Sequence, residues 1–206
     1  MHRRTVLFLP ALLLPLTARA AAPDRLLAYG DSNTWGMGAD PRSQCYAMRL
    51  AARLGRTLDN RAVSGTFVPQ HVAAIQATTF AAGDLIVWLT GYNDMRGGTP
   101  LDEYAAQLDA GLAATAAPVW LGNCLRMVEE GYTDMPGGFG SDARVAAMNV
   151  IIAEVAARHA HVRLVDCCAA YDPENNADLV HPNNAGHSQI ATAFAPWRLF
   201  SPIWGG

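Results

Sequence analysis

Several common features are scarce or missing in this sequence of 206 residues. It has no lysine, so all 15 basic residues are arginines, and 18 acidic residues leave a formal charge of −3. Without a basic excess to neutralise phosphates, the chain is not expected to bind nucleic acid. Charged residues make up only 16% and hydrophobic residues 51%. This composition excludes a disordered chain and is sufficient for a globular core.

Long apolar runs are also missing beyond the N-terminus. The run at residues 6–16 is too short for a membrane-spanning helix, which needs about 20 residues. A basic start, Met1–Arg4, precedes it, and Ala18-Arg19-Ala20 follows with the small residues that signal peptidases recognise. We therefore predict a signal peptide over 1–20 and a single domain over 21–206, exported to the periplasm or secreted and not inserted in a membrane after cleavage. A membrane anchor is the alternative, and the sequence leaves the Sec and Tat routes open.

Export would place the cysteines in an oxidising compartment, where disulfides persist. The four residues are Cys45, Cys124, Cys167 and Cys168. Three full pairings are open, and we favour a bridge between Cys124 and Cys167 or Cys168, because these residues close two predicted strands. His159 and His161 stand alone without the ligand spacing of a metal site. We expect no metal and no cofactor.

Five short runs rich in Leu, Val and Ile alternate with five stretches of helical character. The predicted strands are Leu26–Tyr29, Leu58–Val63, Asp84–Thr90, Pro118–Gly122 and Val162–Asp166. The predicted helices are Gln44–Leu54, Val68–Phe80, Leu101–Ala116, Asp142–His159 and Asn184–Ala193. Arg126–Gly140 is expected to be an irregular surface loop. The alternation is typical of a doubly wound α/β domain with five parallel strands and helices on both faces.

Polar turns, three of which contain glycine, follow several of these strands. They are Gly30-Asp31-Ser32-Asn33, Ser64-Gly65, Gly91-Tyr92-Asn93-Asp94 and Asp178–Asn183. Ligands of such sheets bind beyond the carboxyl ends of the strands, so the four turns are expected to form one site.

The turns contain the residue types that acyl transfer requires. A serine hydroxyl becomes a nucleophile when an imidazole accepts its proton, which points to Ser32 and His181. Asp178 lies three residues before His181 and can fix the tautomer of the ring. The tetrahedral intermediate needs preorganised donors for its negative oxygen. The backbone N–H groups of Ser32 and Gly65 and the side-chain amide of Asn93 are the candidates.

In order and spacing, these segments resemble the sequence blocks of the SGNH (GDSL) hydrolase superfamily. The matching blocks are Gly30-Asp31-Ser32, Gly65, Gly91-x-Asn93-Asp94 and Asp178-x-x-His181-Pro182-Asn183. The resemblance implies a flavodoxin-like three-layer α/β/α sandwich and metal-independent hydrolysis of esters, thioesters and some amides. It also implies Ser32 as nucleophile, His181 as base, Asp178 as the residue that orients the base, and Ser32, Gly65 and Asn93 as the oxyanion hole.

The first block departs from the family name at one position, where Asn33 stands in place of leucine, a variation that is common in the family. The signatures of two other enzyme classes are absent. The Gly-x-Ser-x-Gly elbow of α/β-hydrolases is missing because position 34 is threonine. The glycines after the first strand do not form Gly-x-Gly-x-x-Gly, which excludes a Rossmann dinucleotide site.

Titratable residues near the blocks are expected to have supporting roles. Asp31 and Asp94 can hold their turns through hydrogen bonds to backbone groups. Asp172 is a less favoured alternative partner for His181. His71 and His187 are interpreted as solvated or capping helix residues.

Aromatic residues beside the blocks suggest a substrate cleft. Trp35 and Tyr92 are candidates to line it, with ordinary packing as the alternative for each. Trp88 and Trp120 lie in the middle of predicted strands and are expected in the core.

These observations favour an exported carboxylesterase that removes short acyl groups, such as acetyl, from a carbohydrate or another envelope molecule. The alternatives with the same catalytic residues are a lysophospholipase or thioesterase for longer chains and an acyltransferase. A binding module without activity is disfavoured, because all three catalytic residue types are present.

Overall fold

The computed structural model describes residues 24–133 and 139–195, so the predicted signal peptide lies outside the described residues. All five predicted strands are present and form one parallel sheet in the order β2-β1-β3-β4-β5. The strands are β1 (Arg25–Tyr29), β2 (Thr57–Asn60), β3 (Leu85–Leu89), β4 (Val119–Gly122) and β5 (Val162–Val165). This is the flavodoxin-like order, which confirms the predicted fold class.

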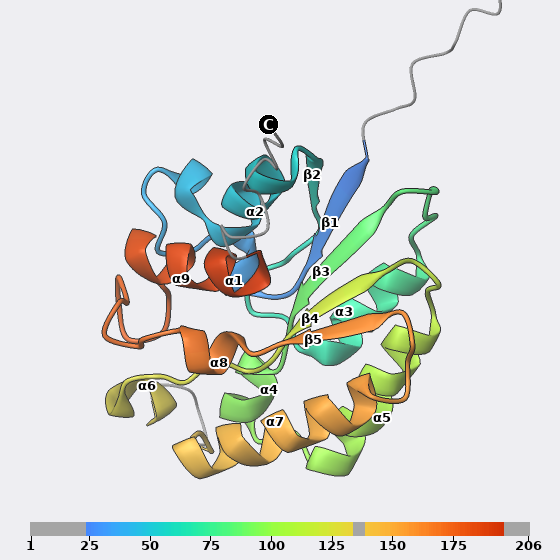
Figure 1. The fold of residues 1–206 in the computed structure, drawn as a ribbon. Helices are drawn as coiled ribbons and strands as arrows, with labels where there is room; N and C mark the ends of the chain where they lie inside the picture. Colours follow the sequence, from blue (N-terminus) through green and yellow to red (C-terminus); the bar gives the residue numbers. More distant parts are fainter. Residues whose placement is uncertain (1–23, 134–138, 196–206) are drawn as a thin grey trace, which may run out of the picture.

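Helices cover both faces of the sheet (Figure 1). One face is covered by α2 (Tyr46–Leu54) and α9 (Asn184–Phe194), and the other by α3 (Val68–Gln76), α5 (Leu101–Ala113) and α7 (Asp142–Ala156). The shorter helices are α1 (Ser32–Trp35), η1 (Arg42–Gln44), α4 (Tyr92–Gly97), α6 (Glu129–Thr133) and α8 (Cys167–Ala170). The three layers are those of an α/β/α sandwich.

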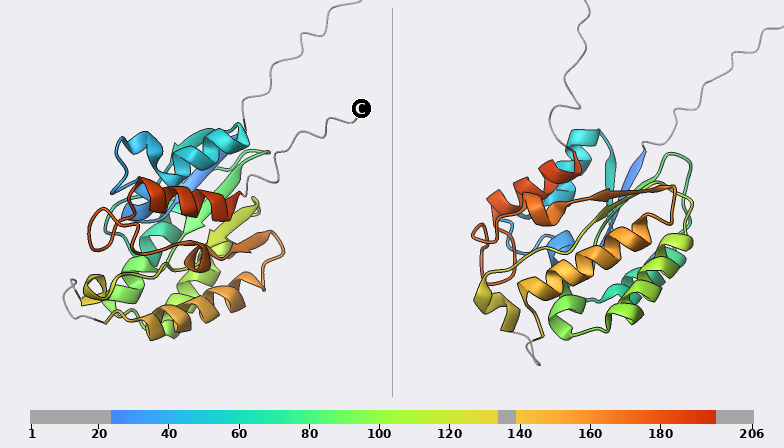
Figure 2. Two further views of the ribbon diagram at one scale, coloured as in Figure 1. Left: turned by 60° about the vertical axis from the view of Figure 1, so that its left-hand side comes forward. Right: turned by 60° about the horizontal axis from the view of Figure 1, so that its bottom comes forward.

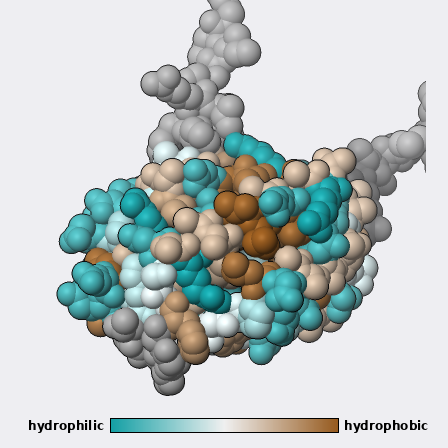
Figure 3. Space-filling view, turned by 90° about the horizontal axis from the view of Figure 1, so that it is seen from below, coloured by the Kyte–Doolittle hydropathy of each residue, from teal (hydrophilic) through white to brown (hydrophobic). Residues whose placement is uncertain are grey.

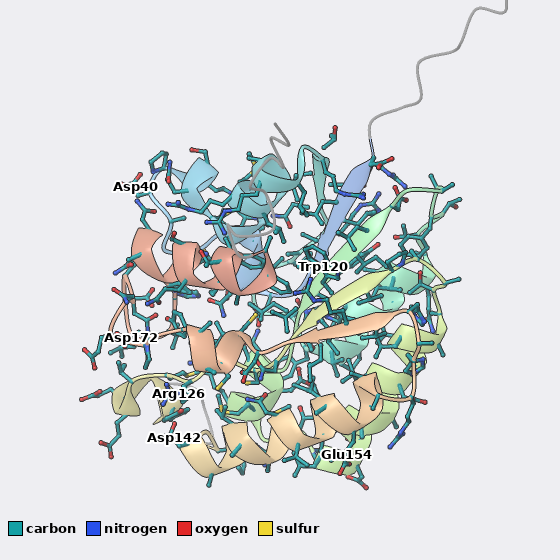
Figure 4. The ribbon with its side chains drawn as sticks, in the orientation of Figure 1. Asp40, Trp120, Arg126, Asp142, Glu154 and Asp172 are labelled. Carbon is teal, nitrogen blue, oxygen red and sulfur yellow. The ribbon has the colours of Figure 1, made fainter. Side chains whose placement is uncertain are left out.

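The sequence of the strands follows their place in the sheet. Central β3 reads Leu-Ile-Val-Trp-Leu and is buried at every residue, as expected for a strand covered on both faces. The edge strands β2 and β5 are more exposed. Trp88 is fully buried in the core, as predicted. Trp120, in contrast, is only partly buried, and the guanidinium of Arg163 lies 4.9 Å from the centre of its ring (Figure 4).

Some element ends differ from the prediction. Strand β2 stops at Asn60, because the side chain of Asn60 accepts a hydrogen bond from the N–H of Ala62 and turns the chain. Helix α6 lies within the stretch that was expected to be irregular. On the face formed by α5 and α7, apolar side chains gather near the middle and polar ones surround them (Figure 3). Val150 of α7 is 56% exposed.

The predicted disulfide bridge is wrong in this structure, because all four cysteines are free thiols. The end of β4 is held instead by a side-chain amide from α7. Asn149 accepts a hydrogen bond from the N–H of Cys124 at 2.8 Å and donates one to its carbonyl at 3.0 Å.

The topology determines where a ligand can bind. Helices α1, α4 and α8 follow β1, β3 and β5 directly and lie together at the carboxyl edge of the sheet (Figure 2). Within residues 24–133 and 139–195, no helix has the length and apolar character needed to cross a membrane.

Candidate active site

Ser32 stands at a sharp turn between β1 and α1. Gly30 has a φ of +149°, and a Cβ atom there would come within 2.7 Å of the carbonyl oxygen of Leu89, so a side chain would be strained at this position. Asp31 caps α1 by accepting a hydrogen bond from the N–H of Asn33 at 2.9 Å. The turn places Ser32 at the first position of α1, where it is 5% exposed.

His181 and Asp178 reach Ser32 from the loop before α9. The Nε2 atom of His181 lies 3.1 Å from the Oγ atom of Ser32, and its Nδ1 atom lies 2.7 Å from Oδ2 of Asp178. The other carboxylate oxygen of Asp178 accepts the N–H groups of Val180 at 2.8 Å and His181 at 2.7 Å. The structure thus joins the carboxylate, imidazole and hydroxyl that the sequence predicts in one chain of hydrogen bonds.

The charge on Asp178 fixes the proton on the ring. Burial raises the pKa of Asp178, but hydrogen bonds from the His181 ring and from two backbone N–H groups outweigh this effect and hold it below its usual value. An ionised carboxylate can only accept a hydrogen bond, so the Nδ1 atom of His181 carries the proton. Its Nε2 atom is then free to accept a proton from Ser32.

The histidine loop is held by its own backbone and by neighbouring segments. The N–H of Ala177 donates to the carbonyl of His181 at 2.8 Å, and Asn183 caps α9. The loop that follows α1 packs directly against it, because a Cβ atom on Gly38 would lie only 2.3 Å from the carbonyl oxygen of Pro182. Asp40 and Asn184 exchange two hydrogen bonds beside this contact (Figure 4).

Tyr92 also supports the loop. It does not line the cleft, contrary to the prediction. Its side chain is 3% exposed, and its hydroxyl donates to the carbonyl of Val180, the residue before His181. Trp35 is partly buried, and the guanidinium of Arg42 lies 3.6 Å from the centre of its ring. One face of the indole is therefore covered by Arg42.

The candidate oxyanion donors other than the N–H of Ser32 come from two turns. Gly65 has a φ of +79°, a conformation that favours glycine. Asn93, the second residue of α4, donates from its amide nitrogen to the carbonyl of Thr66 at 2.9 Å. An amide carries two hydrogens, so this bond leaves one hydrogen of Asn93 for a substrate.

The two acidic residues beside the blocks hold turns, as predicted. Asp94 accepts hydrogen bonds from the N–H of Val68 at 3.0 Å and from the hydroxyl of Thr99 at 3.2 Å. Burial raises the pKa of Asp31 to about 7 and the pKa of Asp94 to about 6. Asp172 accepts the N–H of Glu174 at 3.1 Å at the outer end of its loop, and the partner of His181 is Asp178 (Figure 4).

His71 and His187 are buried, contrary to the prediction of solvated or capping residues. His71 is 4% exposed and bonds Trp88 and Thr66, while His187 is fully buried and bonds the N–H of Tyr46 and the carbonyl of Met37. Burial lowers the pKa of each histidine to about 4, so both are neutral at neutral pH.

A sequence signal for these two histidines exists. On α3, His71 continues the buried stripe formed by Val68, Val72 and Ile75. On α9, His187 begins a buried stripe of the same spacing, which continues with Ile190, Ala191 and Phe194. The spacing i, i+3, i+4, i+7 places each histidine on the core-facing side of its helix.

Metal ligands do not cluster in the described part of the chain. No group of three or more His, Cys, Asp or Glu side chains there is arranged to hold a metal ion. His159 pairs with Asp109, and His161 lies 3.2 Å from the carbonyl of Leu112.

A parallel sheet with Ser, His and Asp joined at its carboxyl edge is an arrangement that serine hydrolases use. The model of the GDSL-like lipase/acylhydrolase family matches residues 28–189, and the chain belongs to this family. No curated protein matches the chain.

Solved structures share the fold at low sequence identity. A member of the lipolytic G-D-S-L family from Veillonella parvula is 20% identical with a TM-score of 0.67, over 87% of this chain and 99% of that one. Est24, a carbohydrate acetylesterase from Sinorhizobium meliloti, is 16% identical with a TM-score of 0.65, over 85% of this chain and 98% of that one. The esterase EstA from Pseudoalteromonas, inhibited by monoethylphosphonate, is 16% identical with a TM-score of 0.60, over 82% and 93%.

Proposed function

We propose that the protein is an exported serine hydrolase that cleaves carboxylic esters through an acyl-enzyme on Ser32, without a metal. The observation that carries this proposal is the chain of hydrogen bonds from Asp178 through His181 to Ser32, at 2.7 and 3.1 Å. These distances are within reach for proton transfer between a nucleophile and its base.

The reaction would proceed in two displacements. The oxygen of Ser32 attacks the ester carbonyl carbon while its proton passes to Nε2 of His181. The carbonyl oxygen becomes negative and is bound by the N–H groups of Ser32 and Gly65 and by the amide of Asn93. The tetrahedral intermediate collapses, and His181 gives its proton to the departing alcohol. Water then attacks the acyl-enzyme in the same way and releases the acid.

For the substrate, we propose short-chain esters, above all acetyl esters on a carbohydrate or another envelope molecule. The similarity to a carbohydrate acetylesterase supports this choice, and so does Trp35, a partly buried residue three positions after Ser32, since aromatic rings stack on sugars.

A second candidate is a lysophospholipase or thioesterase for longer acyl chains. It is favoured by two exposed apolar side chains next to the site. Val63, before the Gly65 turn, is 59% exposed, and Leu179, between Asp178 and His181, is 44% exposed. An acyltransferase would use the same acyl-enzyme with an alcohol in place of water.

Hydrolysis of p-nitrophenyl esters from acetate to palmitate tests the proposal. We expect turnover of the acetate by the wild type and a loss of at least about 10³-fold in kcat for Ser32→Ala and His181→Ala. Ser188→Ala, on α9, is the matched control and should keep full activity. Equal turnover by Ser32→Ala would contradict the mechanism.

The same series separates the substrate classes. A preference for chains above about eight carbons would require a long apolar groove and would favour the second candidate. Product analysis with an added sugar alcohol would reveal transfer. Export is tested separately, by the N-terminal sequence of the protein recovered outside the cytoplasm, which should begin after Ala20.

A further inference from the structure

A chain of hydrogen bonds runs from the buried core of the sheet to the exposed turn that carries Gly65. The indole N–H of Trp88, on β3, donates to Nδ1 of His71 at 3.2 Å. The other ring nitrogen of His71 lies 3.0 Å from the hydroxyl oxygen of Thr66, which in turn donates to the carbonyl of Val63 at 2.6 Å. Trp88 is fully buried and His71 is 4% exposed.

The direction of each hydrogen bond is fixed. An indole N–H can only donate, so Nδ1 of His71 must accept and its proton is on Nε2. Burial lowers the pKa of His71 to about 4, which keeps the ring neutral at neutral pH. The ring therefore donates to Thr66, and the hydrogen of the Thr66 hydroxyl is directed to Val63. Every donor in the chain has one acceptor.

The turn receives little support from packing. Val63, Ser64 and Gly65 are all exposed, and a Cβ atom added to Gly65 would meet no atom within 4 Å. A pocket of about 40 Å³ borders the turn on the side of Thr66 and His71. The conformation of the turn therefore depends on its hydrogen bonds.

Thr66 also connects the two candidate oxyanion donors. It follows Gly65 in the sequence, and its carbonyl accepts one amide hydrogen of Asn93 at 2.9 Å. A change in the position of Thr66 would move the backbone of Gly65 and would also release the amide of Asn93.

We propose that His71 is a positioning residue for the oxyanion hole, which holds Thr66 so that the Gly65 N–H and the Asn93 amide are directed at the same oxygen. This proposal rests on the proposed function. His71 does not touch the substrate and takes no part in proton transfer. It acts through Thr66, and Trp88 fixes its tautomer.

The test compares variants that differ by one hydrogen-bonding group. Thr66→Val removes the hydroxyl at nearly constant shape, whereas Thr66→Ser keeps it. Trp88→Phe removes the indole N–H and keeps an aromatic ring. We expect kcat for p-nitrophenyl acetate to fall about 10-fold in Thr66→Val and Trp88→Phe, with KM within about twofold, and to stay near the wild-type value in Thr66→Ser. His71→Leu should match Thr66→Val, and His159→Leu, which alters a histidine paired with Asp109, is the control.

A double-mutant cycle with Asn93→Ala adds a measure that general destabilisation would not change. If Thr66 acts through Asn93, Thr66→Val should reduce kcat much less in the Asn93→Ala background than in the wild type. Equal reductions in the two backgrounds would overturn the proposal, and so would a Thr66→Val enzyme with wild-type kcat or a Thr66→Ser enzyme as slow as Thr66→Val.

The tautomer gives a readout without turnover. In ¹⁵N-labelled protein, NMR should show the proton of the His71 ring on Nε2. A proton on Nδ1 would overturn the proposed role of His71 and would leave the proposed function unaffected. A wild-type protein that cleaves no ester would contradict the proposed function, and with it the role of His71. An active wild type with unaffected Thr66→Val and Trp88→Phe variants would contradict only the role of His71.

Discussion

The hydroxyl of Tyr92 donates a hydrogen bond to the carbonyl of Val180, the residue that precedes His181. Tyr92 is also the neighbour of Asn93 on α4. One short helix therefore supplies a candidate oxyanion donor and anchors the loop that carries the candidate base. The two halves of the site share this support, so a disturbance of α4 should affect both.

Tyr92→Phe removes that anchor and keeps the ring. We expect kcat to fall about 5- to 10-fold with little change in KM, because a net hydrogen bond contributes about 1 kcal/mol. Ester kinetics measure kcat and KM, and denaturant unfolding measures the stability of the variant. Tyr29→Phe, which loses a hydrogen bond to Thr78, is the control and should lower stability without lowering kcat. A Tyr92→Phe enzyme with wild-type kcat would show that the loop keeps its position without the bond.

Asn93→Ala removes the side-chain donor of the oxyanion hole. We expect a loss of about 10²- to 10³-fold in kcat with little change in KM, because the developing negative oxygen is bound more strongly than the ground-state carbonyl. Steady-state kinetics with the acetate ester measures both constants. Unchanged kcat and KM would remove Asn93 from the oxyanion hole.

Asp31→Asn should change the pH dependence of stability. The pKa of Asp31 is raised by burial from 3.8 to about 7, so the folded state keeps a proton that the unfolded state has lost. Its contribution to stability is fully present below about pH 4 and is lost as the pH rises to about 7. Asparagine caps a helix as well as aspartate and has no charge to bury.

The two unfolding curves should therefore diverge. Relative to the wild type, Asp31→Asn should gain about 2 kcal/mol in the free energy of unfolding between pH 5 and pH 8. The buried histidines titrate in both proteins, so their effects cancel in the difference. Parallel stability curves across this range would show that the pKa of Asp31 is not raised.

Asn33→Leu should stabilise the fold. Asn33 is fully buried, and neither atom of its side-chain amide has a hydrogen-bond partner within the described residues. An unpaired buried polar group costs about 1–3 kcal/mol, so an apolar side chain of similar size should raise the free energy of unfolding by about 1–2 kcal/mol. Asn123→Leu has the opposite expected sign, because the amide of Asn123 bonds Asp166 and the N–H of Cys168. Urea unfolding of both variants measures the change in the free energy of unfolding. A lower value for Asn33→Leu than for the wild type would contradict the prediction.

The sheet could be predicted because its signals are local. Apolar runs such as Leu85–Leu89 alternate with long helices, and the five predicted strands all occur within three residues of their observed ends. The short helices were missed because segments of three to six residues are too short to show a periodic pattern. Helix α5 begins after Pro100 without a side-chain cap, and the hydroxyl of the preceding Thr99 donates to Asp94 instead.

The candidate catalytic residues could be predicted for a different reason. Ser32, Asp178 and His181 lie in short segments whose residue types suit one reaction, and the topology brings the segments to one edge. The roles of His71 and Tyr92 depend on partners that lie in other elements, Trp88 and Val180. Which side chain meets which across the core is not encoded in any local segment, so these residues were interpreted as solvated or cleft-lining.

The order of the elements along the chain has a consequence for biogenesis. Ser32 belongs to the turn between β1 and α1, whereas His181 lies 149 residues later, just before α9. During synthesis the candidate nucleophile therefore emerges long before the candidate base. If the two residues act together as proposed, a nascent chain or one truncated before α9 should contain an ordinary, unreactive serine, and activity should require that α9 has been synthesised and docked.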